Sequence, residues 1–162
     1  MTPIQDCIIN KNTKISPIWI MRQAGRYLPE FREIRAKNTD FVKLCLNESL
    51  SSEITLQPIK RFDFDAAIIF SDILMLPYGL GQEVKFEKGL GPKLGKLDLD
   101  LISNVNKDQF SGKLNPVYKS ILNISSNPIC KNKDIIGFVG APWTILVYMV
   151  NKISPKKNLS KE

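Results

Sequence analysis

The chain has 162 residues and a formal net charge of +7, from 23 lysines and arginines against 16 acidic residues. This length is enough for one domain with a sizeable core, and the apolar and charged fractions are those of an ordinary globular protein. The lysines are scattered and do not alternate with aromatic residues, so we expect affinity for anions but no binding of nucleic acid.

Cysteine and histidine usage argues against two further kinds of site. The three cysteines are odd in number and widely spaced, which disfavours a disulfide framework and favours a reducing compartment. Because the chain has no histidine and no Cys-x-x-Cys pair, we expect no metal. The N-terminus lacks the pattern of a signal peptide, and the most apolar run, residues 135–150, is shorter than the ~20 residues of a membrane span. We therefore predict a cytoplasmic protein without membrane contact.

The first 16 residues are polar and irregular, and we expect a flexible arm over 1–16, ordered from near Ile15, ahead of one domain over 17–162. Residues 17–35 then contain four of the chain's five arginines: Arg22, Arg26, Arg32 and Arg35. This bias indicates a need for the guanidinium group, a planar fork of donors suited to carboxylate or phosphate. The alternative is a surface helix in which these arginines form ion pairs with Glu30 and Glu33.

Two helices are predicted next. Pro29 suits the first turn of one helix, whose inner side carries Phe31 and Ile34. Asn47 can cap a second helix, and Pro58 within that helix predicts a kink or an early end.

Two apolar runs without polar alternation, residues 66–70 and 135–139, are typical of strands buried on both faces of a parallel sheet. Asp72 comes just after the first run. Because α/β folds place their chemistry at the carboxyl edge of such a sheet, Asp72 is a candidate active-site carboxylate. The competing interpretation is that Asp72 caps the turn that follows it.

The glycine-rich stretch over residues 77–95 predicts a hairpin or loop, since its glycine spacing does not fit a dinucleotide-binding motif. Residues 98–108 have the composition of polar connecting chain. We expect a helix to begin at Asn115-Pro116 with an apolar stripe of Val117, Ile121 and Leu122.

Pro142 is predicted to open the last helix. Its expected core face consists of Trp143, Leu146, Val147 and Val150. Tyr148 lies off this stripe, so it is available for a role other than packing.

Three segments together resemble one family. Arg22-Gln-Ala-Gly-Arg26-Tyr-Leu-Pro-Glu-Phe-Arg32 looks like the signature of uroporphyrinogen decarboxylases, and residues 70–74 and 137–148 resemble two further blocks of that family, in the same order. The resemblance implies an α/β fold, the N-terminal portion of a TIM (β/α)₈ barrel with preceding helices. A whole barrel takes ~250 residues, and the family's active-site serine and histidine have no counterpart here. We therefore expect an incomplete barrel, a fragment that is unstable and inactive alone.

The resemblance also implies the chemistry. The substrate would be uroporphyrinogen, which bears eight carboxylates and loses its four acetate carboxyls as carbon dioxide to give coproporphyrinogen, without a cofactor. Asp72, Arg22 and Tyr148 would be catalytic, Asp72 by stabilising a cationic pyrrole and Arg22 chiefly by binding and orienting the substrate. The residues expected to contact substrate are Arg22, Gln23, Ala24, Gly25, Arg26, Arg35, Asp72 and Tyr148.

Two other functions compete with this one. A cobalamin-linked methyltransferase would have a similar fold, although the motif from Arg22 to Arg26 speaks against it. A module that binds a tetrapyrrole or another anionic ligand without catalysis would keep the arginines alone. For the full-length enzyme the resemblance implies a homodimer.

Overall fold

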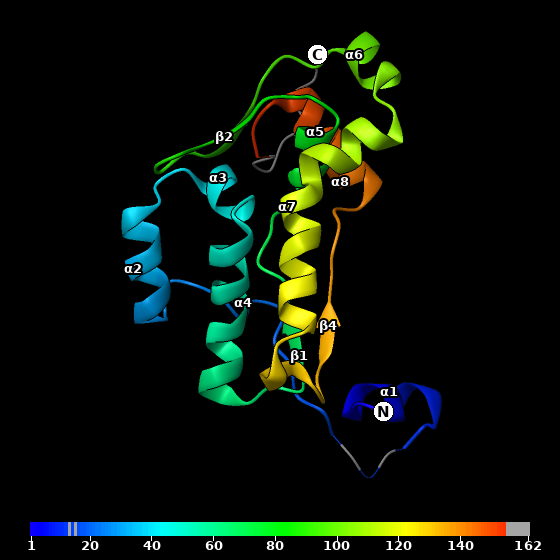
Figure 1. The fold of residues 1–162 in the computed structure, drawn as a ribbon. Helices are drawn as coiled ribbons and strands as arrows, with labels where there is room; N and C mark the ends of the chain where they lie inside the picture. Colours follow the sequence, from blue (N-terminus) through cyan, green and yellow to red (C-terminus); the bar gives the residue numbers. More distant parts are fainter. Residues whose placement is uncertain (13, 15, 155–162) are drawn as a thin grey trace.

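The computed structural model describes residues 1–12, 14 and 16–154 (Figure 1). Ile15 and the last eight residues of the domain expected over 17–162 lie outside the described residues. The elements, in chain order, are α1 (Pro3–Ile9), α2 (Pro29–Lys37), α3 (Phe41–Cys45), α4 (Glu48–Phe62), β1 (Ala66–Ile68), α5 (Met75–Gly79), β2 (Val84–Glu87), β3 (Gly91–Leu94), α6 (Leu99–Asn104), α7 (Lys107–Ser125), a 3₁₀ turn (Pro128–Cys130), β4 (Asp134–Ile136) and α8 (Pro142–Asn151). The fold is mixed α/β.

The two apolar runs form a parallel pair of strands, β1 and β4, in which Ala67 faces Ile135. The long helices α4 and α7 pack against each other and against this pair (Figure 1). Ala66 and Ala67 are fully buried, as expected. The expectation that the second strand is buried on both faces is wrong, because β4 is half-buried and has only β1 as a neighbour within the described residues.

Local signals placed several helix starts correctly. Pro29 is the first residue of α2, and Phe31 on this helix is buried. Asn47 caps α4, since its side-chain oxygen accepts a hydrogen bond from the Leu50 N–H at 2.9 Å. The early end expected at Pro58 does not occur, and α4 continues to Phe62. Tertiary burial of this helix offsets the backbone hydrogen bond that proline cannot donate.

Two segments expected to be irregular contain helices. In the N-terminal arm, α1 begins with a capping box between Thr2 and Gln5, and both side chains bond to the carboxylate of Asp134. In the stretch expected to be connecting chain, α6 begins at the cap Asp98. Side-chain caps of this kind satisfy the first backbone N–H groups of a helix.

The helix expected to begin at Asn115 begins earlier. Asn106 forms a capping box with Gln109, so α7 starts at Lys107, and Pro116 lies inside it. The expected apolar stripe is correct for Val117 and Ile121 and wrong for Leu122, which is 65% exposed, while Ile124 is fully buried.

The glycine-rich stretch forms the predicted hairpin. Strands β2 and β3 are antiparallel, with Val84 opposite Leu94. Gly89 and Gly91 adopt positive φ angles of 83° and 89° around its turn, a conformation that glycine adopts at little cost.

Helix α8 opens at Pro142 as predicted, but it turns a different face to the core. Ile145 and Met149 are buried, whereas Trp143, Leu146 and Val150 are 68%, 48% and 54% exposed. Because α8 is apolar on nearly all sides, its periodicity does not decide which face is inside. Gly140 contributes to the choice, since a Cβ there would lie 2.4 Å from Cδ1 of Ile145.

A second glycine makes the contact between α5 and α7 testable. A Cβ on Gly79 would lie 2.5 Å from Cε2 of Phe110, so Gly79→Ala is expected to lower the free energy of unfolding by about 1–3 kcal/mol through overpacking. Gly112 in α7 has no described atom within 4 Å of such a Cβ, and Gly112→Ala is expected to stabilise by about 0.5–1 kcal/mol. Urea denaturation measures both variants. Equal stabilities would contradict the packing at Gly79.

Candidate active site

Asp72 lies beyond the carboxyl end of β1, where the sequence placed it. Its Oδ1 accepts a hydrogen bond from the Leu74 N–H at 2.8 Å, so the capping interpretation is correct as geometry. The carboxylate is half-buried and forms no ion pair with any described residue. Burial raises the pKa of Asp72, and the bond from Leu74 offsets only part of this shift. Keeping this carboxylate ionised therefore costs the folded protein stability.

The buried thiol of Cys45 lies within electrostatic range of both Asp72 and Arg35. Burial raises the pKa of the Cys45 thiol, the charge of Asp72 raises it further, and Arg35 opposes the shift. The Arg35 guanidinium lies 5.4 Å from the ring centroid of Phe41 and donates to the carbonyl of Asn38. Of the predicted arginines, Arg35 is the one whose charge acts on Cys45, the thiol that also feels the charge of Asp72.

Packed aromatic rings hold this neighbourhood together. Phe70, just after β1, has its ring centroid 5.9 Å from that of Phe31 in α2 and 5.7 Å from that of Phe41 in α3. The ring centroid of Phe41 in turn lies 4.6 Å from that of Phe86 in the hairpin. The segment that leads to Asp72 is therefore fixed against α2, α3 and β2, and Arg35 stacks on the same group of rings.

Gln23 is buried to 2% exposure, and its side chain binds β1 rather than an open surface. Its Nε2 donates to the Ala66 carbonyl at 2.7 Å, and its Oε1 accepts from the Ile68 N–H at 3.0 Å. Ala24 packs against the cluster around Leu28. Gly25 is half-buried beside the ring of Tyr27.

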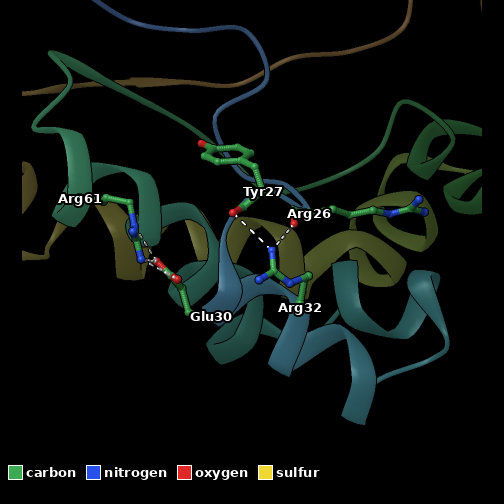
Figure 2. Close-up of polar contacts among 5 residues, drawn as sticks. All are labelled: Arg26, Tyr27, Glu30, Arg32 and Arg61. Atoms are coloured by element: carbon green, nitrogen blue, oxygen red, sulfur yellow. Dashed lines mark hydrogen bonds and ion pairs between the residues drawn. The ribbon is translucent and has the colours of Figure 1, made fainter.

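Arg22 and Arg26 are exposed, and their guanidinium groups form no hydrogen bond or ion pair with the described residues. Figure 2 shows the Arg26 side chain extending away from Arg32, which donates to the Arg26 carbonyl at 2.7 Å. Glu30 pairs with Arg61 at 3.0 Å instead of with an arginine of residues 17–35. The surface ion pairs offered as the alternative are therefore absent at Glu30, and both guanidinium groups are available to a ligand.

Tyr148 is half-buried on α8 and packs in the cluster that contains Leu74 and partly buried Ile73, the residues next to Asp72. Its hydroxyl lies 3.3 Å from Oγ of Ser154, within hydrogen-bonding distance. The described structure contains no hydrogen bond between Tyr148 and Asp72.

A groove of about 840 Å³ lies elsewhere, between α3 and the hairpin. Its lining includes Lys43, Lys85, Lys88 and Lys113 but none of the predicted site residues. Acidic residues Asp40, Glu83 and Glu87 also line the groove, which weakens its attraction for anions. We therefore favour the surface around Asp72, where a half-buried carboxylate has no ion-pair partner among the described residues.

Sequence reasoning missed Cys45 and the structural use of Gln23. The cysteine is buried on α3, and its proximity to Asp72 depends on contacts between segments distant in the chain. Gln23 stands beside Arg22 in the motif, and nothing in the sequence showed that its side chain is buried.

No helix within the described ranges combines the length and apolar character needed to cross a bilayer. Nor do those ranges bring together three or more histidine, cysteine, aspartate or glutamate side chains that could hold a metal ion.

A family model described as uroporphyrinogen decarboxylase matches residues 2–161. Proteins of that name from Chelativorans sp. and Brucella anthropi are 48% and 47% identical over 134 residues, 83% of this chain and 39% of each relative. A methyltransferase from Methanosarcina mazei has a similar fold, with a TM-score of 0.64 and 15% identity over 91% of this chain and 44% of that one. The chain thus spans about two-fifths of the length of these relatives, and it belongs to the uroporphyrinogen decarboxylase family.

Proposed function

We propose that this chain forms one wall of the active site of an enzyme that decarboxylates the four acetate side chains of uroporphyrinogen to give coproporphyrinogen in porphyrin biosynthesis. The proposal rests chiefly on Asp72, whose half-buried carboxylate has no ion-pair partner among the described residues. The chain that carries it belongs to the uroporphyrinogen decarboxylase family. The names of the relatives supply the substrate. The exposed guanidinium groups of Arg22 and Arg26 suit its carboxylates.

The chemistry needs an electron sink and a countercharge. Protonation of a pyrrole at its α-carbon makes the ring a cationic acceptor. The bond between the acetate methylene and its carboxyl then breaks, carbon dioxide leaves, and the electron pair enters the ring. Protonation of the methylene carbon and loss of the ring proton give the methyl group. An ionised Asp72 would stabilise the cationic ring and hold pyrrole N–H groups.

The arginines would bind and orient the substrate. A guanidinium can form two parallel hydrogen bonds to one carboxylate, which fixes the acetate that lies over the reacting position. Arginine has a pKa above ~12 and is a poor acid at neutral pH, so the protons would come from water or from a substrate carboxylate. Arg35 would be a further contact for a substrate carboxylate, and Tyr148, which packs in the cluster that contains Leu74, would border the same surface.

The fold supports a larger assembly. The parallel strands β1 and β4 correspond to two neighbours of a (β/α)₈ barrel, with Asp72 at the carboxyl edge. Phe138 and Val139, after β4, are 43% and 68% exposed, as is expected of surfaces that further barrel elements cover. We propose that residues 17–162 form part of this barrel and are inactive without the rest of it. We also propose that the full-length protein is a homodimer.

A fused protein tests the proposal. This chain would be joined, at the aligned position, to the C-terminal part of the relative from Chelativorans sp., and uroporphyrinogen turnover would be followed by chromatography of the oxidised products. We expect coproporphyrinogen from the fused protein and none from the chain alone. A folded fusion that binds uroporphyrin but forms no product would favour the binding module instead, and one that neither binds nor reacts would contradict both functions.

A further inference from the structure

The two ends of the Gln23 carboxamide occupy one edge of β1. The groups that they bind, the Ala66 carbonyl and the Ile68 N–H, flank Ala67 on the edge opposite β4. The alternate residues face β4, since the Asp65 carbonyl accepts from the Asp134 N–H at 3.0 Å and the Ile69 N–H donates to Ile136 at 3.1 Å.

A parallel neighbouring strand would make the same two bonds. One residue of such a strand donates its N–H to one carbonyl and accepts, at its own C=O, from the N–H two residues further along. On the other edge, β4 does this with Asp134 and Ile136. The carboxamide of Gln23 is a planar donor and acceptor of the same kind. It therefore replaces a strand peptide and satisfies an edge that would otherwise leave two backbone groups unpaired.

The backbone on either side of Gln23 is fixed as well. Upstream, the Ile18 N–H donates to Oδ2 of Asp65 at 2.7 Å, and the Asp65 N–H donates to the Ile18 carbonyl at 2.9 Å. Downstream, the Tyr27 hydroxyl donates to the Gln23 carbonyl. The segment from Ile18 to Tyr27 is therefore bonded to β1 through Gln23. Beyond Gln23, the Tyr27 hydroxyl bonds back to the same segment.

We propose that Gln23 is a positioning residue. It fixes the positions of Arg22 and Arg26 relative to Asp72 and does not bind substrate itself. Both ends of its amide bond to β1 and the residue is 2% exposed, so the carboxamide is not accessible for the substrate contact expected from the motif. The strand that Gln23 clamps continues directly to Asp72. This role rests on the proposed function, because it concerns how two parts of one binding surface are aligned.

Gln57 is a matched control for changes at Gln23. It is a buried glutamine of α4 at 5% exposure, and neither end of its amide has a hydrogen-bond partner among the described residues. Replacing a buried amide that has partners leaves those partners unpaired, whereas replacing one without partners does not. Both Gln23→Leu and Gln57→Leu therefore remove a buried amide. Only Gln23→Leu also removes the two hydrogen bonds to β1.

The experiment measures hydrogen exchange at the Ile68 amide and uroporphyrin affinity by fluorescence, using the fused protein described above. Gln23→Leu is expected to speed exchange at Ile68 about tenfold or more and to weaken uroporphyrin binding about tenfold. Gln57→Leu is expected to change neither quantity by more than about twofold.

Gln23→Glu adds a signature that simple loss of packing would not produce. The ionised carboxylate cannot donate to the Ala66 carbonyl, but the protonated acid can donate there and still accept from Ile68. Protection of Ile68 and uroporphyrin affinity should both recover as the pH falls from 8 to 5. Arg22 and Asp65 are the charged groups nearest in sequence to Gln23 and Ala66, and both are also present in the unsubstituted protein. Dividing the Ile68 protection and the uroporphyrin affinity of Gln23→Glu by those of the unsubstituted protein at each pH therefore isolates the effect of the new carboxyl group.

The outcomes separate two failures. Ile68 exchange or uroporphyrin affinity that stays within about twofold of the unsubstituted fused protein in Gln23→Leu would overturn the positioning role, as would the absence of recovery in Gln23→Glu. An unsubstituted fused protein that binds no uroporphyrin would instead refute the proposed function, and the positioning role would fall with it.

Discussion

Asp72→Asn is expected to slow decarboxylation by the fused protein about 100- to 1000-fold, the usual cost of removing a well-placed electrostatic group. Asparagine keeps the side-chain oxygen that accepts from the Leu74 N–H, so the turn after β1 should persist. It loses the negative charge that would stabilise the cationic pyrrole. Single-turnover rates with uroporphyrinogen measure the effect, and a normal rate would remove Asp72 from the mechanism.

Asp72→Asn is expected to raise the stability of the folded protein although it slows the reaction. Burial raises the pKa of Asp72 in the folded state, so the folded protein is penalised wherever this group must ionise. Below the unfolded pKa of about 3.9 the penalty vanishes, and it grows as the pH rises through the raised folded pKa. Denaturation of the 162-residue chain from pH 3 to 8 should therefore show Asp72→Asn gaining stability relative to the unsubstituted chain as the pH rises. A loss of stability at pH 7 would mean that the carboxylate serves the fold.

Arg22→Lys and Arg26→Lys are each expected to weaken uroporphyrin binding about 10- to 100-fold although the charge is kept, because lysine cannot form the paired bonds of a guanidinium. Titration of the fused protein by fluorescence measures the dissociation constants.

Arg61→Lys is the control for the arginine substitutions. Arg61 forms a two-point contact with Glu30 and lies outside the motif. We expect its replacement to leave uroporphyrin affinity unchanged. Equal losses in all three variants would indicate a general charge effect, and no loss at Arg22 or Arg26 would show that guanidinium geometry is irrelevant there.

Sequence patterns located elements where a single local signal decided the outcome. Pro29 and Pro142 open helices, and Asn47 caps one, because these residues act on backbone groups within a few positions. Where two signals competed, the pattern failed. Asn115 was the predicted cap, but Asn106 and Gln109 form a capping box and the helix begins there, with Asn115 in its interior.

The candidate site was predictable in its residue types but not in its arrangement. The carboxyl edge of a buried strand pointed to Asp72, and the concentration of arginine pointed to Arg22 and Arg26. The bonds from Gln23 to β1 and the approach of Cys45 to Asp72 depend on contacts across the fold, which no local pattern encodes. The core face of α8 was wrong for the same reason, because its neighbours select the buried side.

A structure of the fused protein with bound uroporphyrin tests most directly whether Arg22, Arg26 and Asp72 serve one ligand. We expect the macrocycle to lie with its pyrrole N–H groups toward Asp72 and its carboxylates on Arg22 and Arg26. A macrocycle seated in the groove beside Lys43 and Lys113, with Asp72 and the two arginines on separate surfaces, would contradict the proposed function.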